Sequence, residues 1–468
     1  MKSSERRTTA WCLVAGSALV VAARSSPAQI AFDPAVVIQL PTAHFPTDVL
    51  PVDLDHDGDL DLVVPGRGVE GFLYVLRGVG NGTFLPPQAL AIGLPTDSVD
   101  AADLDADGRI DLVLAGRAAL GRLVILRGRG DGTFDPPRLI RLEREPRGVA
   151  LGDFDADGDL DAAATNYGTG SLVMTTIAPD LSASVAAART LGRESVAQCF
   201  PQEVIAADLD ADGRPEAVVS TLGSGRVQVV PFDPGSLAPG TPRGTRPPLV
   251  AGLQGGITTC RVLDFDADGD LDCMLPLLMI GAQQHVAVLL NDGSGRFTER
   301  RAIPSLFTGF SWSGDAADLD LDGRIDLVVG AALPGTLAVM RNITEPGASE
   351  WSFFFPIPYY EGSFIRSIRT PDLDGNGRRD VVAAEIGSHR VVILMNRSGN
   401  GVAGDGAAGE GAVRGSSAPP RLSTDRRDPP RPTIDRNLDG TLDAADLALE
   451  LADFGPPAPE APIAEKPR

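Results

Sequence analysis

The sequence predicts an all-β fold, and three observations lead to this prediction. An aspartate-rich nonapeptide occurs seven times in the 468-residue chain, at intervals of 50 to 56 residues. Short apolar or alternating segments of strand length flank each copy. Glycine (53 residues) and proline (38 residues) are abundant, and no long segment keeps the apolar spacing of a helix. About four strands per repeat is the spacing of propeller blades, so we predict a seven-bladed β-propeller.

Each repeat has the same order of elements. The nonapeptides begin at Asp53, Asp103, Asp153, Asp208, Asp264, Asp318 and Asp372. An apolar strand precedes most copies, as at 49–52, and another follows, as at 62–64. A glycine-rich turn then leads to an alternating strand such as 72–76 or 122–126. In the best-preserved copies a turn of the type seen at 81–84 (NGTF) leads to a fourth strand.

The two ends of the repeat region complement each other. After Asn396 the seventh repeat loses its pattern without supplying a fourth strand. Residues 32–40 (FDPAVVIQL) match 134–142 (FDPPRLIRL), where the fourth strand of the second repeat begins. We therefore expect the N-terminal strand to complete the last blade and close the ring, which leaves no open sheet edge there.

The residues of the nonapeptides are those that bind calcium, which prefers six to eight oxygen ligands. In the first loop Asp53, Asp55 and Asp57 offer carboxylates, Gly58 permits the sharp turn, and Asp61 closes the shell. Position seven supplies its backbone carbonyl, so aspartate and arginine are interchangeable there. Carboxylates this close repel one another unless a cation lies between them. The predicted calcium ligands are Asp53, Asp55, Asp57, Asp59, Asp61, Asp103, Asp105, Asp107, Arg109, Asp111, Asp153, Asp155, Asp157, Asp159, Asp161, Asp208, Asp210, Asp212, Arg214, Glu216, Asp264, Asp266, Asp268, Asp270, Asp272, Asp318, Asp320, Asp322, Arg324, Asp326, Asp372, Asp374, Asn376, Arg378 and Asp380.

Two of the seven loops depart from the pattern. Pro215 and Glu216 end the fourth loop, and Glu216 keeps a carboxylate. Asn376 replaces an aspartate in the seventh loop, so we expect that loop to bind its ion most weakly. We expect these ions to hold hairpins together, without a regulatory or catalytic duty, because extracellular calcium modules commonly bind at millimolar calcium.

The repeats also resemble a known family. The pattern DxDxDGxxDLVV with a following GxGTF turn is similar to the FG-GAP or VCBS repeats of integrin-α-type propellers, from residue 32 to residue 396. This resemblance implies a calcium-bound propeller used for adhesion or ligand binding. Members of the family also occur beside enzymatic domains.

A different calcium motif lies near the C-terminus. Residues 435–446 have the twelve-residue EF-hand spacing, with an aspartate closing the loop. An apolar helical face follows within 444–455. Segment 433–455 resembles half of a dockerin, which implies an anchoring tail; the alternative is a degenerate remnant. Its predicted ligands are Asp435, Asn437, Asp439, Thr441, Asp443 and Asp446.

The N-terminal segment of the sequence indicates that the protein is exported. Residues 1–28 have the basic start, short apolar run and small residues of a signal peptide. The run is too short to span a bilayer, so we expect an exported, soluble chain. We assign residues 29–396 to the propeller, 397–432 to a flexible linker and 456–468 to a disordered tail. The formal net charge of −22 argues against nucleic acid and anionic membranes as partners.

The three cysteines beyond the predicted signal peptide do not form a disulfide framework. Cys199, Cys260 and Cys273 remain after that segment. Cys260 and Cys273 stand where other repeats have small apolar residues, so we expect them to be buried. One disulfide is compatible with an oxidising compartment, and the sequence leaves its partners open.

No catalytic motif is recognisable, so we expect a module that binds an extracellular protein or glycan. The alternatives are a calcium-dependent polysaccharide lyase or hydrolase and a purely structural cell-surface component. Ligands of propellers usually contact loops around the central channel, and we expect the face opposite the calcium loops to be used. Aromatic residues suit such a face, unless they cap the ends of blades. The candidates are Phe307, Phe310, Trp312, Tyr359 and Tyr360.

Overall fold

The structure of the protein is a computed structural model, and its regular secondary structure is entirely β-strand in the part it describes. None of the described residues forms a helix that is long and apolar enough to cross a membrane. The predicted signal peptide, linker, EF-hand segment and C-terminal tail lie outside these residues. The structure describes residues 30–41, 45–68, 70–118, 120–191, 200–222, 226–240, 255–279, 284–304, 311–331, 335–344, 351–354 and 356–398.

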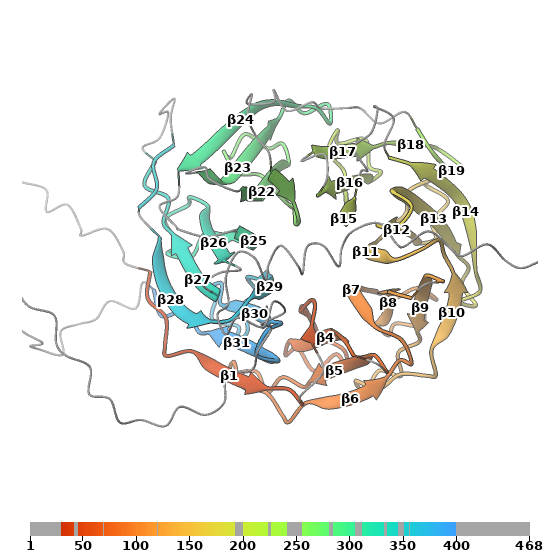
Figure 1. Cartoon of the computed structure of the whole chain (residues 1–468), viewed down its shortest axis with the longest axis horizontal. Helices are drawn as coiled ribbons and strands as arrows, with labels where there is room; N and C mark the ends of the chain where they lie inside the picture. The colour runs from red at the N-terminus through yellow and green to blue at the C-terminus, as the bar shows by residue number, and fades with distance from the viewer. Residues whose placement is uncertain are drawn as a thin grey trace, which may run out of the picture.

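Seven antiparallel sheets are arranged around a common centre, as Figure 1 shows. The predicted seven-bladed β-propeller is confirmed. The innermost strands lie nearest the centre of the ring. These strands are β2 (Phe45–Pro46) and β3 (Leu50–Val52), β7 (Thr96–Ala102), β11 (Pro146–Gly152), β15 (Pro201–Ala207), β20 (Gly255–Ile257) and β21 (Arg261–Leu263), β25 (Ser311–Ala317) and β29 (Ile365–Arg369). The second strands are β4 (Asp61–Arg67), β8 (Asp111–Gly116), β12 (Asp161–Asn166), β16 (Glu216–Thr221), β22 (Asp272–Met279), β26 (Asp326–Ala331) and β30 (Val381–Glu385).

The third and outer strands complete the blades. The third strands are β5 (Phe72–Leu76), β9 (Arg122–Leu126), β13 (Ser171–Ile177), β17 (Arg226–Val230), β23 (Gln284–Asn291), β27 (Gly335–Met340) and β31 (Arg390–Leu394). The outer strands are β6 (Gln88–Ala91), β10 (Arg138–Arg141), β14 (Ala183–Thr190), β24 (Phe297–Pro304), β28 (Ile357–Gly362) and β1 (Val36–Gln39). The fourth blade departs from the expected four strands: within its described residues a three-stranded sheet is followed by a separate hairpin of β18 (Phe232–Asp233) and β19 (Ser236–Pro239).

The first described strand lies beside the last described one. Strand β1 pairs antiparallel with β31, with Val36 opposite Ile393 and Gln39 opposite Arg390. Phe32 forms a bridge with Asn396, as Phe134 does with Gly128 at the start of a fourth strand. In Figure 1 the red β1 therefore runs along the outer edge of the blue sheet that ends the described propeller.

The hydrophobic core consists of layers between neighbouring blades. Successive residues of a strand point to opposite faces, and both faces of each blade are covered, so second strands such as β8 are apolar and buried along their length. Leu62 and Val64 of the first blade pack with Val382 and Val391 of the seventh, in the same cluster as Leu40. The ring thus has a buried layer between its first and last blades as well.

Candidate metal centres

Each nonapeptide folds into a tight loop between an innermost strand and a second strand. The fourth and sixth positions adopt left-handed backbone conformations, for example His56 (φ 57°) and Gly58 (φ 91°) in the first loop. The sixth N–H donates to the carboxylate at position one in all seven loops, as Gly58 does to Asp53 at 3.0 Å. The seventh N–H donates to the side-chain oxygen at position five in all seven loops. These bonds wrap the backbone around the acidic side chains.

The loops bring three carboxylates together. In each of five loops three carboxylate oxygens lie within 4.8 Å of one another, and two further acidic groups of this kind occur among the described residues. Four of the five sets join positions one, three and nine, as in Asp103, Asp105 and Asp111, and the first joins Asp53, Asp55 and Asp57. The predicted clustering is therefore observed, with position five used mainly to accept the N–H of position seven.

Several of these oxygens are buried without a hydrogen-bond partner. They belong to positions one and three, and to position nine in the third loop. The atoms are Asp53 Oδ1, Asp55 Oδ1, Asp155 Oδ1, Asp161 Oδ2, Asp264 Oδ1, Asp320 Oδ1 and Asp374 Oδ1. A buried carboxylate oxygen that accepts no hydrogen bond is costly unless a cation satisfies it. An all-oxygen set of this kind fits a hard divalent cation.

The carboxylate at position nine also braces the hairpin. Asp61 accepts the N–H of Gly78 at 2.7 Å and that of Leu54 at 3.3 Å, so it joins the loop to the end of the third strand. Burial, followed by repulsion from the other loop carboxylates, raises the pKa of Asp161 to about 7. Burial raises the pKa of Asp326 to about 7 as well, despite the N–H groups that it accepts. Position nine therefore joins the hairpin and has a raised pKa in these two loops.

Arginine side chains that were not predicted from the sequence complete several loops. Arg77, at the end of the third strand, is ion-paired with Asp55 of the same blade. Arg127 contacts Asp105 at 2.7 Å, and Arg397 contacts Asp374 at 3.1 Å. Arg341 pairs with Asp320 in the same way. An arginine 23 to 25 residues after the first aspartate of four repeats was the signal available in the sequence.

At position seven the side chains stay outside the carboxylate cluster. Arg214 pairs with Asp212, and Arg324 pairs with Asp322. Both contacts join position seven to position five of the same loop. This placement agrees with the expectation that position seven offers only its carbonyl to an ion.

The fourth loop position allows a test of backbone strain. Leu321 has a φ of 60° and is 56% exposed, so its side chain gains little by packing. We expect Leu321→Gly to raise the free energy of unfolding by about 1 kcal/mol, because glycine adopts this conformation without steric cost. The matched control is Gly323→Ala, which has open space but a φ of 83°; it should lower stability by a similar amount. Denaturant titration measures the free energy of unfolding of both variants. A Leu321→Gly protein less stable than the original would contradict backbone strain at this position.

A family of known repeats matches parts of this sequence. The FG-GAP-like repeat family matches residues 53–114, 103–164 and 275–329. This chain carries FG-GAP-like repeats. The first two matched segments each run from one nonapeptide loop through the next loop to the second strand of the following blade, so each contains two loops. A search of curated proteins finds no match.

The FG-GAP-like propeller is also similar to a solved structure of a lectin from Agrocybe aegerita. That lectin is described as specifically recognising non-reducing terminal N-acetylglucosamine. The two chains are 20% identical, the likeness covers 76% of this chain and 86% of the lectin chain, and the TM-score is 0.46.

The structure corrects the predicted aromatic ligand face. Trp312 is 1% exposed and packs edge-on against Phe364, with centroids 4.9 Å apart, so it caps the interior and presents no free ring. Tyr359 and Tyr360 lie on β28, an outer strand, where an inter-blade loop was expected. Their hydroxyls donate to the carbonyl of Ile30 at 2.7 Å and to Glu385 at 2.8 Å. The other two candidates, Phe307 and Phe310, lie outside the described residues.

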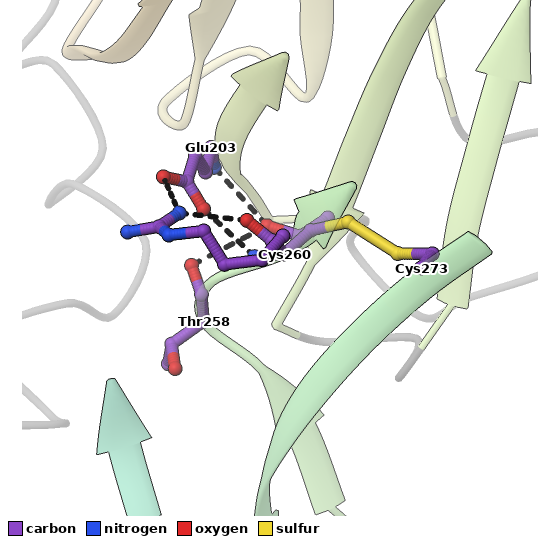
Figure 2. Close-up of a disulfide and its surroundings, with 6 residues drawn as sticks. Glu203, Thr258, Cys260 and Cys273 are labelled. Atoms are coloured by element: carbon purple, nitrogen blue, oxygen red, sulfur yellow. Dashed lines mark hydrogen bonds and ion pairs between the residues drawn. A yellow bond between two sulfur atoms is a disulfide. The ribbon is translucent and has the colours of Figure 1, made fainter. Parts of the chain in front are cut away.

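A disulfide joins Cys260 and Cys273, the two cysteines that were expected to be buried (Figure 2). Both are fully buried, and the bond links the residues that precede and follow the fifth nonapeptide loop. The sequence could not choose this pairing because the two positions become neighbours only when β21 and β22 pair. Cys199 lies outside the described residues.

Proposed function

We propose that this protein is a calcium-stabilised β-propeller that serves as an extracellular binding module for a protein or glycan ligand. The observation that supports it best is the repeated convergence of carboxylates in the loops, with buried oxygens that lack hydrogen-bond partners. Up to seven calcium ions occupy the propeller in this proposal, and the sequence motif at 435–446 holds one more.

Calcium suits these loops better than other common cations. The converging groups are carboxylates, which favour calcium or magnesium over the softer metals that histidine and cysteine bind. Magnesium demands near-ideal octahedral geometry at short distances, whereas calcium accepts a flexible oxygen shell. Millimolar calcium outside the cell matches weak structural sites, in line with the signal-peptide pattern of residues 1–28.

The proposed assembly depends on a closed ring, and we propose that β1 provides the closure by completing the seventh blade. A rigid ring leaves the loops opposite the metal centres fixed for recognition. The function is tested with glycan arrays and cell-surface pull-downs, each with and without a chelator. Calcium-dependent retention of a ligand would support a binding module. Turnover of a polysaccharide would instead make the protein an enzyme.

The proposed calcium sites predict how the stability of the protein, and the stabilisation by calcium, change with pH. Because the pKa values of Asp161 and Asp326 are raised, the metal-free folded chain binds more protons than the unfolded chain. The stability of the metal-free protein should therefore fall as the pH rises from about 4 to about 7. Calcium competes with those protons, so the stabilisation it gives should grow over the same range.

Thermal unfolding between pH 5 and pH 8, in EDTA and in calcium, measures both trends. Asp161→Asn removes one titrating group and should flatten the slope seen in EDTA. Equal stabilisation by calcium at pH 5 and at pH 8 would contradict the assignment of position nine as a ligand.

A further inference from the structure

A polar cavity lies in the central channel, at the end away from the metal loops. The innermost strands begin at this cavity, and the nonapeptides follow the other ends of these strands. The cavity encloses about 40 Å³. It has lining residues from six blades, and the charged ones are Asp48, Asp97, Arg147, Glu203, Arg261 and Arg366.

Two of the carboxylates in the cavity wall are already matched by an arginine. Glu203 contacts Arg261 at 2.8 Å. It also accepts the N–H of Cys260 (Figure 2). Asp48 contacts Arg369 at 3.1 Å. Arg261 also lies 3.6 Å from Asp315, so these groups bring no excess of positive charge to the cavity.

The third carboxylate of the wall, that of Asp97, contacts two arginines. It accepts two hydrogen bonds from Arg67, at 2.5 and 3.0 Å, and lies 3.4 Å from Arg147. The arginines hold the pKa of Asp97 well below its usual range despite its burial. One carboxylate therefore contacts two guanidinium groups, which come from the blades on either side of it.

Arg366 adds a further cation to this wall. Its guanidinium lies 5.1 Å from the centre of the Trp312 ring, which fixes its position, and it forms no ion pair with any described residue. It stays partly exposed, so solvent or a ligand reaches it from the channel. Burial and the nearby Arg67 lower the pKa of Arg366 to about 10. Arginine nevertheless remains charged at neutral pH, and it is the residue best suited to bind carboxylate and sulfate groups.

We propose that this end of the channel binds an oxyanion, the carboxylate or sulfate group of an acidic glycan, through Arg366. The inference rests on the proposed binding function and names the chemistry of its ligand. The net charge of the chain is −22, so an anion is expected to bind only where an arginine such as Arg366 lines a recessed site. The small volume admits one anionic group, so the rest of the sugar lies in the channel mouth.

Titration calorimetry in calcium tests the proposal with glucuronate, inorganic sulfate and neutral glucose as probes. We expect glucuronate to bind and glucose to bind at least tenfold more weakly, with affinity falling as salt rises. Arg366→Gln should weaken glucuronate binding tenfold or more, and Arg366→Lys should weaken it less. The control Arg129→Gln, at an exposed arginine paired with Asp135 in a turn on the metal-loop side of the ring, should change nothing.

A second variant keeps the test valid if Arg366→Gln folds poorly. Ser98 lines the same cavity, and Ser98→Glu supplies a carboxylate there, which should abolish anion binding and raise the melting temperature. Sulfate binding that depends on Arg366, without glucuronate binding, would overturn the glycan as the source of the oxyanion. Equal affinities for glucuronate and glucose would overturn the proposal. The proposed function is tested separately, by calcium-dependent melting and by ligand capture.

Discussion

Removing calcium is expected to lower the melting temperature of the propeller by about 10 °C or more. A site that sees free calcium at ten times its dissociation constant gains about 1.4 kcal/mol of stability. Seven such sites would contribute on the order of 10 kcal/mol, which is comparable to the entire stability of many domains. The physical reason is that clustered carboxylates, such as those of Asp155 and Asp161, repel each other in the empty loops.

Thermal unfolding of the purified protein in EDTA, in millimolar calcium and in millimolar magnesium measures this effect. Magnesium is the ionic control, and we expect it to restore only a small part of the stability. Asp155→Asn removes a ligand from one loop and should reduce the calcium effect by about a seventh, if the sites act independently. Identical unfolding in EDTA and in calcium would remove the basis of the proposed calcium sites.

The fold was predictable from the sequence because each repeat carries the same pattern of strands and turns. The nonapeptides set the number of blades, and the match between 32–40 and 134–142 indicated where β1 would lie. The acidic loop residues were predictable for the same reason, since sequence neighbours in a tight loop remain neighbours in space. The fourth blade was less predictable, because its hairpin of β18 and β19 lacks the regular turn of the other repeats.

The arginine-rich cavity could not be predicted in this way. Arg67, Asp97, Arg147 and Arg366 come from different blades, so they are separated in the sequence and meet only when the ring forms. The burial of Trp312 was hard to predict for a related reason. Trp312 begins an innermost strand, and the residues that bury it, such as Phe364, come from the next blade. Composition identifies aromatic residues but does not distinguish a binding face from a cap.

Deleting residues 30–40 is expected to have the second large effect, because these residues supply the outer strand of the seventh blade. The truncated chain would lose the four residue pairs between β1 and β31 and the buried side chains of Ile30 and Leu40, which are 4% and 1% exposed. Each buried side chain contributes about 1.5–3 kcal/mol. With the lost backbone pairing, we expect a loss on the order of 5 kcal/mol, a lower melting temperature and self-association through the freed edge of β31.

Size-exclusion chromatography with light scattering, together with thermal unfolding, measures both consequences of this deletion. The matched control replaces Val36 and Val37 with threonine, because these side chains are 46% and 42% exposed and keep the backbone pairing intact. Adding a synthetic peptide of residues 30–41 should restore the monomer and much of the stability, since the edge pairs by main-chain hydrogen bonds that a separate strand can also form. A truncated chain that stays monomeric and unfolds at the original temperature would mean that the ring is held by the layers between blades alone.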